Sequence, residues 1–430
     1  MRKQLKLLSV LVVTMTGLLM VVSPLLFSVA SATYVEGHIT KDAVWTLVDS
    51  PFVVSKDVTV DPAVTLTIEP GVEVRFAENF SLFAEGVIYA VGTKERPIAF
   101  TSNKYDPQAG DWGTIKFSGT TQSTLAYCSV TYATNGSTVE NGRLTIKNSI
   151  IANSLEAGIS VTGNSQVTIQ NNTLGGNADG IFLTGNSISG ATITQNLILL
   201  NTQSGLHLGA NAYSNLVILN NILSANNYGF YSSGNATTIV TNNSISYNGI
   251  GFFYDQAEDH EAHFNDIYGN ERGMDVSEAT VNATYNYWGD ESGPYHASLN
   301  PNGKGDPVGG DGVNLDFIFF LTAPIGYINQ RPTANLISDM KAVQTNQNVT
   351  FFATTSSDDR HVDQYYYNFG DGQNSGWTTL SVFVHKYSSV GTYNATLTVM
   401  DDFGVKSTNV ALVRTSVQNL PPLKASLTTS

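Results

Sequence analysis

The stretch VTIQNNTLGGNADGIFLTG, Val167–Gly185, contains both parts of a unit that recurs through the middle of the chain. The first part is a short block of alternating apolar and polar residues that ends at an asparagine, and the second is a block that contains a glycine. Aligned copies of the first part place the asparagine, or a glutamine, at Asn171, Gln195, Asn220, Asn242, Asn265 and Asn286. The glycines of the second part are Gly158, Gly180, Gly205, Gly229, Gly251 and Gly273. Both series step by 21–25 residues, which indicates a repeat architecture.

Repeats of this length and composition favour a β-solenoid. The blocks alternate apolar, often β-branched residues with polar ones, which is typical of short strands. A repeat this short that contains several Asn and Gly does not supply two amphipathic helices. In a solenoid each strand pairs in parallel with the same strand one coil above, about 4.8 Å away. The repeated Asn then either stacks its amide on the next one along the axis or occupies a left-handed turn position.

The composition agrees with this interpretation. Only 13% of the 430 residues are charged, against about 25% in ordinary domains, while 42% are hydrophobic, which excludes disorder driven by charge. Asn provides the missing polarity, because 22 of the 39 Asn lie between positions 141 and 270. The single Cys128 excludes an intramolecular disulfide and Cys-based zinc sites. The net charge of -14 argues against a nucleic-acid partner.

Two further stretches extend the repeat towards the N-terminus. They are VTLTIEPGVEVRFAENFSLFAEGVIYAVGTKERPIAF (Val64–Phe100) and GDWGTIKF (Gly110–Phe117), and both resemble the entry coils of surface β-helix proteins. The whole of Val58–Trp288 resembles the right-handed parallel β-helix of the carbohydrate-binding and sugar-hydrolase family. NYWGDESGPYHASLNPNGKGDPV (Asn286–Val308) resembles the exit coil of that family's copper-maturation-like relatives. The resemblance implies an all-β fold of about ten coils.

A second domain is expected at Thr333–Gln418, where alternation resembles that of an antiparallel sandwich. Its YYNFGDG (Tyr366–Gly372), HKY (His385–Tyr387), GTY (Gly391–Tyr393) and VMDD (Val399–Asp402) segments resemble a PKD domain. The family's usual Trp-Asp before this turn is replaced by Tyr367-Asn368. The resemblance implies an Ig-like β-sandwich that acts as a spacer or adhesion module.

The chain is therefore expected to comprise five segments. A positive start (Arg2, Lys3 and Lys6), an apolar run to Phe27 and the small residues before a cleavage site at Ala32 predict a signal peptide over 1–32. Retention of this segment as a membrane anchor is the alternative, since the apolar run is long enough to span a bilayer. The others are a β-helix with its entry strands and exit coil over 33–322, a linker over 323–332, the PKD domain over 333–418 and a tail over 419–430.

Catalytic candidates are few. Glu156 and Asp179 are the only acids between Arg143 and Ile250 and lie one coil apart, so they could stack about 5 Å from each other. A pair of carboxylates is the minimum for glycoside hydrolysis. Both residues also precede the repeat glycine, in Glu156-Ala157-Gly158 and in Asp179-Gly180, which favours solvated turn positions over catalysis.

Metal-site candidates are concentrated in one segment. Asp255–Asp266 carries Asp255, Glu258, Asp259, His260, Glu261, His263 and Asp266, which could hold Ca²⁺ through carboxylates or a transition metal through the histidines. A solvated loop is the competing interpretation. Asp371 and Asp401-Asp402 in the second domain could also bind Ca²⁺, although Asp-Gly at Asp371 favours a turn. His207 and His385 are expected to be structural.

Carbohydrate-binding candidates are aromatic residues in successive coils, where outward rings could stack on sugar faces: Tyr231, Phe253, Tyr254, Tyr287 and Trp288. Alternation turns some of them inward, so core stacking is the competing interpretation. Asn348 and Asn394 are the preferred N-glycosylation acceptors.

The sequence favours a secreted or cell-surface protein that binds a polysaccharide, a surface glycan or a surface protein without catalysis. A polysaccharide lyase or hydrolase acting on the β-helix face is the second interpretation. A periplasmic-type metal-maturation factor, indicated by the exit coil and by His260 and His263, is the third.

Overall fold

The computed structural model describes residues 32–185, 190–210, 216–234, 237–310, 314–325, 331–358, 362–401 and 404–419. The chain divides after Ile325 into two compact units. The predicted signal peptide up to residue 31, half of the predicted linker (326–330), Asp402 and the tail from 420 onwards lie outside the described residues. In the described part of the chain, no helix is long and apolar enough to cross a bilayer.

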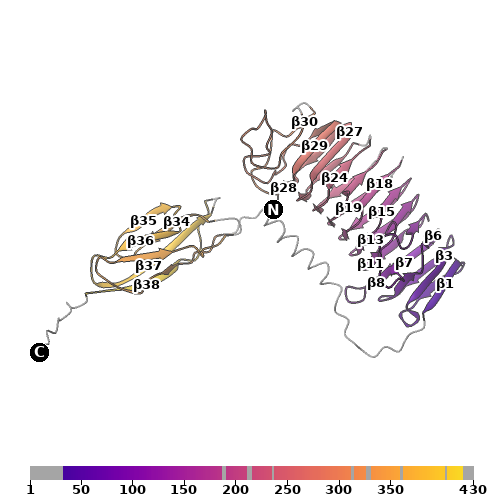
Figure 1. The fold of residues 1–430 in the computed structure, drawn as a ribbon, viewed down its shortest axis with the longest axis horizontal. Helices are drawn as coiled ribbons and strands as arrows, with labels where there is room; N and C mark the ends of the chain where they lie inside the picture. The colour runs from indigo at the N-terminus through magenta and orange to yellow at the C-terminus, as the bar shows by residue number, and fades with distance from the viewer. Residues whose placement is uncertain are drawn as a thin grey trace, which may run out of the picture. The chain divides into compact units, whose positions relative to one another are not determined.

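The first unit is a parallel β-solenoid of about 11 turns, as predicted (Figure 1). Its strands pair in register with the strand one coil away and form three parallel columns, here called the first, second and third sheets. One 3-10 turn, η1 (Leu47–Asp49), lies in the entry coil. The first sheet comprises β2 (Ala43–Trp45), β4 (Thr65–Ile68), β7 (Val87–Val91), β10 (Ser123–Ala126), β13 (Arg143–Lys147), β16 (Gln166–Gln170), β19 (Gly190–Thr194), β22 (Leu216–Leu219), β25 (Ile239–Thr241), the C-terminal parts of β27 (Ile250–His263) and β29 (Arg272–Asn282), and β30 (Leu315–Asp316).

The second and third sheets follow the first in each coil. The second sheet contains β5 (Glu73–Phe76), β8 (Ile98–Ser102), β11 (Cys128–Thr131), β14 (Ile150–Ala152), β17 (Thr173–Gly175), β20 (Leu197–Leu199), β23 (Ile222–Ser224), β26 (Ser244–Ser246) and β28 (Asp266–Tyr268). The third sheet contains β6 (Leu82–Ala84), β9 (Ile115–Phe117), β12 (Ser137–Glu140), β15 (Ala157–Thr162), β18 (Asp179–Thr184), β21 (Ser204–Leu208), β24 (Tyr228–Ser232) and the N-terminal parts of β27 and β29. The entry strands β1 (Thr33–Ile39) and β3 (Phe52–Val60) contribute to both.

A ladder of buried asparagines runs along the axis between the first and second sheets. In every member but the last, Asn286, the backbone N–H and the side-chain Nδ2 both donate to the asparagine Oδ1 of the next coil at 2.8–3.2 Å. The Nδ2 also donates to a carbonyl of the preceding coil, so one amide joins three coils. The members are Asn172, Asn196, Asn221, Asn243, Asn265 and Asn286.

The ladder corrects the sequence alignment by one residue. Four of the aligned positions precede the ladder, are not buried and have φ of 54–58°: Asn171, Gln195, Asn220 and Asn242. Only Asn265 and Asn286 of the aligned set belong to the ladder itself. The two predicted uses of asparagine, stacking and the left-handed turn, therefore both occur, at adjacent positions in each coil.

A second ladder lies at the other end of the second sheet. It comprises Asn177, Asn201, Asn226, Asn248 and Asn270, and it ends on Asp306. The Asp306 carboxylate accepts three hydrogen bonds, from the Gly269 N–H, the Asn270 N–H and the Asn270 side chain, at 2.7–2.8 Å. Burial raises the pKa of Asp306. A carboxylate of the exit coil thus terminates a column of amides.

The second unit is a two-sheet sandwich. One sheet contains β31 (Ile337–Ser338), β33 (Asn348–Phe352) and β36 (Val382–Lys386), and the other contains β32 (Ala342–Gln344), β38 (Ala411–Gln418), β37 (Gly391–Asp401), β34 (Val362–Asn368) and β35 (Asn374–Thr378). Its core includes Val349, Phe351, Tyr367, Phe369 and Tyr387. Most of its pairings are antiparallel, as the alternating pattern predicted.

Candidate functional site

A column of rings runs along the outer face of the third sheet. Phe182, His207, Tyr231 and Phe253 are paired in register in successive coils. Their ring centroids are 4.7, 4.6 and 5.4 Å apart. Tyr228 packs beside the column, 5.3 Å from Tyr231 and 5.6 Å from Phe253. All five side chains are partly exposed, so the column presents ring edges to solvent.

The column ends at a polar hollow. The position after Phe253 is Asp275, which has no ring. Arg272 donates a hydrogen bond to Asp275 across the strand start. The hollow next to this ion pair has a volume of about 470 Å³, and it is lined by Asn227, Tyr228, Gly249, Ile250, Glu271, Arg272 and Asp275. One aromatic ring, an amide, a guanidinium and two carboxylates therefore face a common space.

Three of the five aromatic candidates are part of the core instead. Tyr254 and Trp288 are fully buried, and Tyr287 is 8% exposed. Tyr254 packs against Phe230, Phe252 and His260 inside the coil. Because these rings face the interior, they cannot stack on a sugar, and only Tyr231 and Phe253 remain from the predicted set.

The predicted carboxylate pair does not form. Asp179 is in register with Ala157, so the residue next to Glu156 one coil along is Ala178. Glu156 is exposed and accepts a hydrogen bond from the Asn135 side chain at 2.7 Å. Asp179 is 9% exposed and lies beside His207. The two carboxylates are therefore held by different partners.

The acidic and histidine-rich segment does not converge on a metal site. Asp255 follows the third-sheet part of β27, whereas Asp266 belongs to the second sheet and accepts a hydrogen bond from the Ile325 N–H. His260 is fully buried, and its ring nitrogens lie 3.1 Å from the Thr238 hydroxyl and 2.8 Å from the Gln256 carbonyl oxygen. Burial lowers the pKa of His260. Glu258 and Asp259 are exposed.

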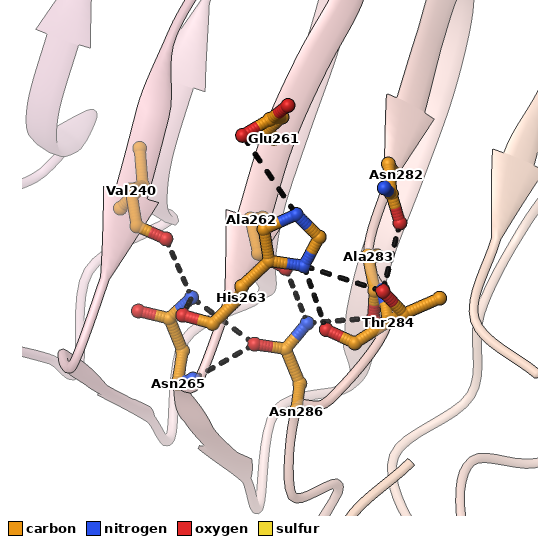
Figure 2. Close-up of polar contacts among 9 residues, drawn as sticks. All are labelled: Val240, Glu261, Ala262, His263, Asn265, Asn282, Ala283, Thr284 and Asn286. Carbon is orange, nitrogen blue, oxygen red and sulfur yellow. Dashed lines mark hydrogen bonds and ion pairs between the residues drawn. The ribbon is translucent and has the colours of Figure 1, made fainter. Parts of the chain in front are cut away.

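His263 lies on the first sheet, three positions after His260 on the same strand, and its side chain is partly exposed (Figure 2). Its Nδ1 donates to the Thr284 carbonyl at 2.9 Å, and its Nε2 is 3.9 Å from Glu261. Figure 2 also shows the end of the first ladder beneath it, where Asn286 donates to Ala262 and Ala283. Across the described ranges no three His, Cys, Asp or Glu side chains are grouped to hold a metal ion.

Polar residues of the sandwich serve its turns. Asp371 accepts a hydrogen bond from the Gln373 N–H and bonds His385 at 2.8 Å. The His385 ring stacks on Phe369 with centroids 3.9 Å apart. Asp401 accepts a hydrogen bond from Val405, and its predicted partner for Ca²⁺, Asp402, is outside the described residues. The two glycosylation candidates, Asn348 and Asn394, are both exposed.

Sequence reasoning treated His207 as structural and missed four other residues of the outer face: Phe182, Tyr228, Ser233 and Arg272. The repeat glycine held the signal that could have found them. The residue after the glycine is inward in each coil, as Ile181, Leu206 and Phe230 show, so the next residue must point outward. Counting from the glycine separates Tyr231 from Tyr254.

Family comparisons agree with the two units. A right-handed β-helix region matches residues 110–245, a pectate-lyase-like β-helix domain matches 37–146, and a PKD domain matches 329–417. Protein bark beetle of Drosophila melanogaster is 38% identical over 65 residues, which are 15% of this chain and 2% of that protein. The chain thus spans a small part of this relative's length.

Solved structures resemble one unit or the other. The PKD1 domain of Vibrio anguillarum Epp is 29% identical, with 22% of this chain and all of that chain covered and a TM-score of 0.18. A PKD domain of an M14-like peptidase from a Thermoplasmatales archaeon is 20% identical, with 21% and 100% covered and a TM-score of 0.19. A periplasmic alginate epimerase is 14% identical, with 65% and 84% covered and a TM-score of 0.43. From the family matches and the observed architecture, the chain combines a right-handed parallel β-helix with a C-terminal PKD domain.

Proposed function

We propose that this protein is exported and binds saccharide chains on the outer face of the third sheet, with the PKD domain as a spacer or adhesion module. The observation that carries the proposal is the column of rings that ends at the polar hollow beside Tyr228. Saccharide sites combine apolar ring surface with a few convergent polar groups that fix hydroxyl orientation. The hollow has both.

The polar groups of the hollow include both hydrogen-bond donors and hydrogen-bond acceptors. Arg272 is a donor only, whereas Glu271 and Asp275 accept hydrogen bonds from sugar hydroxyls. Asn227 provides both kinds of group. Because Arg272 is already paired with Asp275, the pair is held in one geometry before a ligand arrives. Preorganisation of this kind reduces the ordering cost of binding.

The sequence predicted that ring faces of the column would stack on sugars, but most of these faces are covered by neighbouring rings. Rings stacked on one another cover each other's faces, so sugars meet ring edges along most of the column. The stack ends at Phe253, and Tyr228 stands at the border of the hollow, so these two rings are the ones placed to contact a saccharide. A chain lying along the column would follow the 4.8 Å repeat of the coils, roughly one saccharide unit per coil.

The test is a glycan array followed by titration calorimetry with the best saccharide. Tyr228→Ala and Arg272→Ala are expected to weaken binding at least about tenfold each, equivalent to about 1.4 kcal/mol. Tyr89→Ala is the matched control, because Tyr89 is an exposed tyrosine on β7, in the first sheet. An array without any bound saccharide, or equal affinities for the Tyr228 and Tyr89 variants, would refute the proposal.

A further inference from the structure

Three side chains from successive coils form a hydrogen-bonded line on the third sheet. Asp179 lies on β18, His207 on β21, and Ser233 directly after β24. The Asp179 Oδ2 is 3.2 Å from the His207 Nδ1, and the His207 Nε2 is 3.2 Å from the Ser233 Oγ. The two distances fall within the reach of a nucleophile, a base and the group that orients the base.

A backbone hydrogen bond fixes the orientation of the Asp179 carboxylate. Its Oδ1 accepts a hydrogen bond from the Ser204 N–H at 2.9 Å, and the side chain is 9% exposed. The other oxygen, Oδ2, is thereby turned towards His207. A carboxylate can only accept, so the Nδ1 of His207 carries the proton and its Nε2 presents a lone pair to Ser233. This is the tautomer that a general base requires.

The ring column holds the imidazole in place. Phe182 and Tyr231 lie on the two sides of the His207 ring, with centroids 4.7 and 4.6 Å away. With packing on both sides and a hydrogen bond at each nitrogen, the ring has no other orientation available without breaking contacts. Ser233 shares its hydroxyl proton between the His207 Nε2 and the Leu208 carbonyl, at 3.2 and 3.3 Å.

We propose that Ser233, His207 and Asp179 form a nucleophilic site that hydrolyses O-acyl esters. The Ser233 Oγ attacks the acyl carbon while His207 Nε2 takes the hydroxyl proton, and that proton then passes to the departing alcohol oxygen. Water attacks the resulting acyl-serine, with His207 again accepting a proton and returning it to Ser233. The net reaction converts ester and water to carboxylic acid and alcohol, and consumes no other reactant.

Tyr231 is placed to assist at the acyl oxygen. Tyr231 precedes Ser233 by two positions and is, like Ser233, partly exposed, and its ring centroid lies 4.6 Å from that of His207. Burial, together with the nearby Asp255, raises the pKa of Tyr231, so the phenol keeps the proton it would donate. A donor that stabilises the developing oxyanion is the other element that acyl transfer needs.

The surroundings favour a small acyl group carried by a larger molecule. Ser233 and His207 are half-buried on the face of an extended sheet. An acyl ester that projects from a saccharide chain could reach Ser233 while the chain lies along the ring column. The saccharide part of this assignment rests on the proposed function, whereas the ester chemistry does not.

The experiment uses residues 33–430, which is the chain without the predicted signal peptide. A fluorophosphonate probe is expected to label Ser233, located by peptide mass spectrometry, and p-nitrophenyl acetate and an O-acetylated saccharide are expected to be hydrolysed. Ser233→Ala should abolish labelling and lower turnover at least about 100-fold. Ser160→Ala is the matched control, because Ser160 occupies the ring column's position one coil before Phe182. It should keep both activities.

Asp179→Asn tests the positioning role of that residue. Asparagine retains an oxygen for the Ser204 N–H but can present an amide N–H to His207, which reverses the tautomer. We expect the kcat for p-nitrophenyl acetate to fall at least about 100-fold with an unchanged KM and an unchanged thermal midpoint. A merely structural role would move the midpoint instead.

The outcomes separate this proposal from the binding proposal. Hydrolysis of p-nitrophenyl acetate that is present in the wild type and in Ser160→Ala and lost in Ser233→Ala supports the ester site, even if the glycan array shows no bound saccharide. Folded wild-type protein that neither labels at Ser233 nor hydrolyses p-nitrophenyl acetate above the Ser233→Ala background overturns the ester site, even if saccharides bind.

Discussion

Replacing one ladder asparagine should show how much the ladder contributes to stability. In Asn221→Ala, five hydrogen bonds are lost, because Oδ1 accepts two from Asn196 and Nδ2 donates to Ile193, Leu219 and Asn243. The buried Asn196 N–H and the Ile193 carbonyl then have no partner from this side chain. A buried group without a partner costs about 1–3 kcal/mol, so the free energy of unfolding should fall by about 2–5 kcal/mol.

The control for this prediction is the neighbouring residue. Asn220→Gly changes an exposed position with φ of 58°, which glycine adopts freely, so its effect should stay below about 1 kcal/mol. Urea unfolding would measure both variants, and hydrogen exchange would report the Asn196 amide, whose protection should fall at least about 30-fold for a 2 kcal/mol loss. Equal stabilities of the two variants, or unchanged exchange at Asn196, would show that the ladder does not stabilise the coils.

Three further predictions concern the β-helix. Gly229→Ala should destabilise the protein by more than about 2 kcal/mol, because its Cβ would lie 2.6 Å from the Gly251 carbonyl oxygen, whereas Gly190→Ala, with nothing within 4 Å, should be nearly neutral in thermal unfolding. Burial raises the pKa of Asp306 above its unfolded value, so the free energy of unfolding should decline as pH rises from about 4 through the folded pKa. Asp306→Asn should reduce this pH dependence, measured by urea unfolding at pH 4 and pH 7. An unchanged pH dependence in the variant would contradict a raised pKa at Asp306. Burial raises the pKa of the Cys128 thiol to about 12, so iodoacetamide should modify it only after unfolding, and rapid modification of native protein would be inconsistent with the structure.

The fold could be predicted from the sequence because each sequence repeat corresponds to one coil of the solenoid. The interval between repeat glycines equals one turn, and from Gly158 to Gly251 a glycine is required because a Cβ would lie 2.5–2.7 Å from a backbone carbonyl of the next coil, as at Gly205 and Gly229. The exact ladder position was not readable, because Asn171 and Asn172 are the same residue type with opposite environments. The two asparagines differ in their hydrogen bonds, which the sequence does not show.

The site was less predictable for a different reason. A pair such as Phe230-Tyr231 always sends one ring inward and one outward, and composition does not say which. In the line from Asp179 to Ser233, His207 is 28 positions from Asp179 and 26 positions from Ser233, so no local sequence motif predicts the line. The metal hypothesis failed because closeness along β27 is not closeness in space: His260 is inside the coil, and His263 contacts Thr284 on the first sheet.

The two ladders also determine where this chain can change its length during evolution. The segment that joins them is constant, since Asn172 precedes Asn177 by the same five positions that separate Asn221 from Asn226 and Asn243 from Asn248. Variation in coil length therefore enters outside this segment. One extra residue lies before the third sheet in the Asn201 coil, where Leu206 follows Asn201 by five positions while its partner Ile181 follows Asn177 by four. The remaining variation lies between the third sheet and the following first sheet. Insertions there leave both ladders aligned, so this edge is the permissive one for grafting loops. An insertion within the second sheet would shift every later amide out of register.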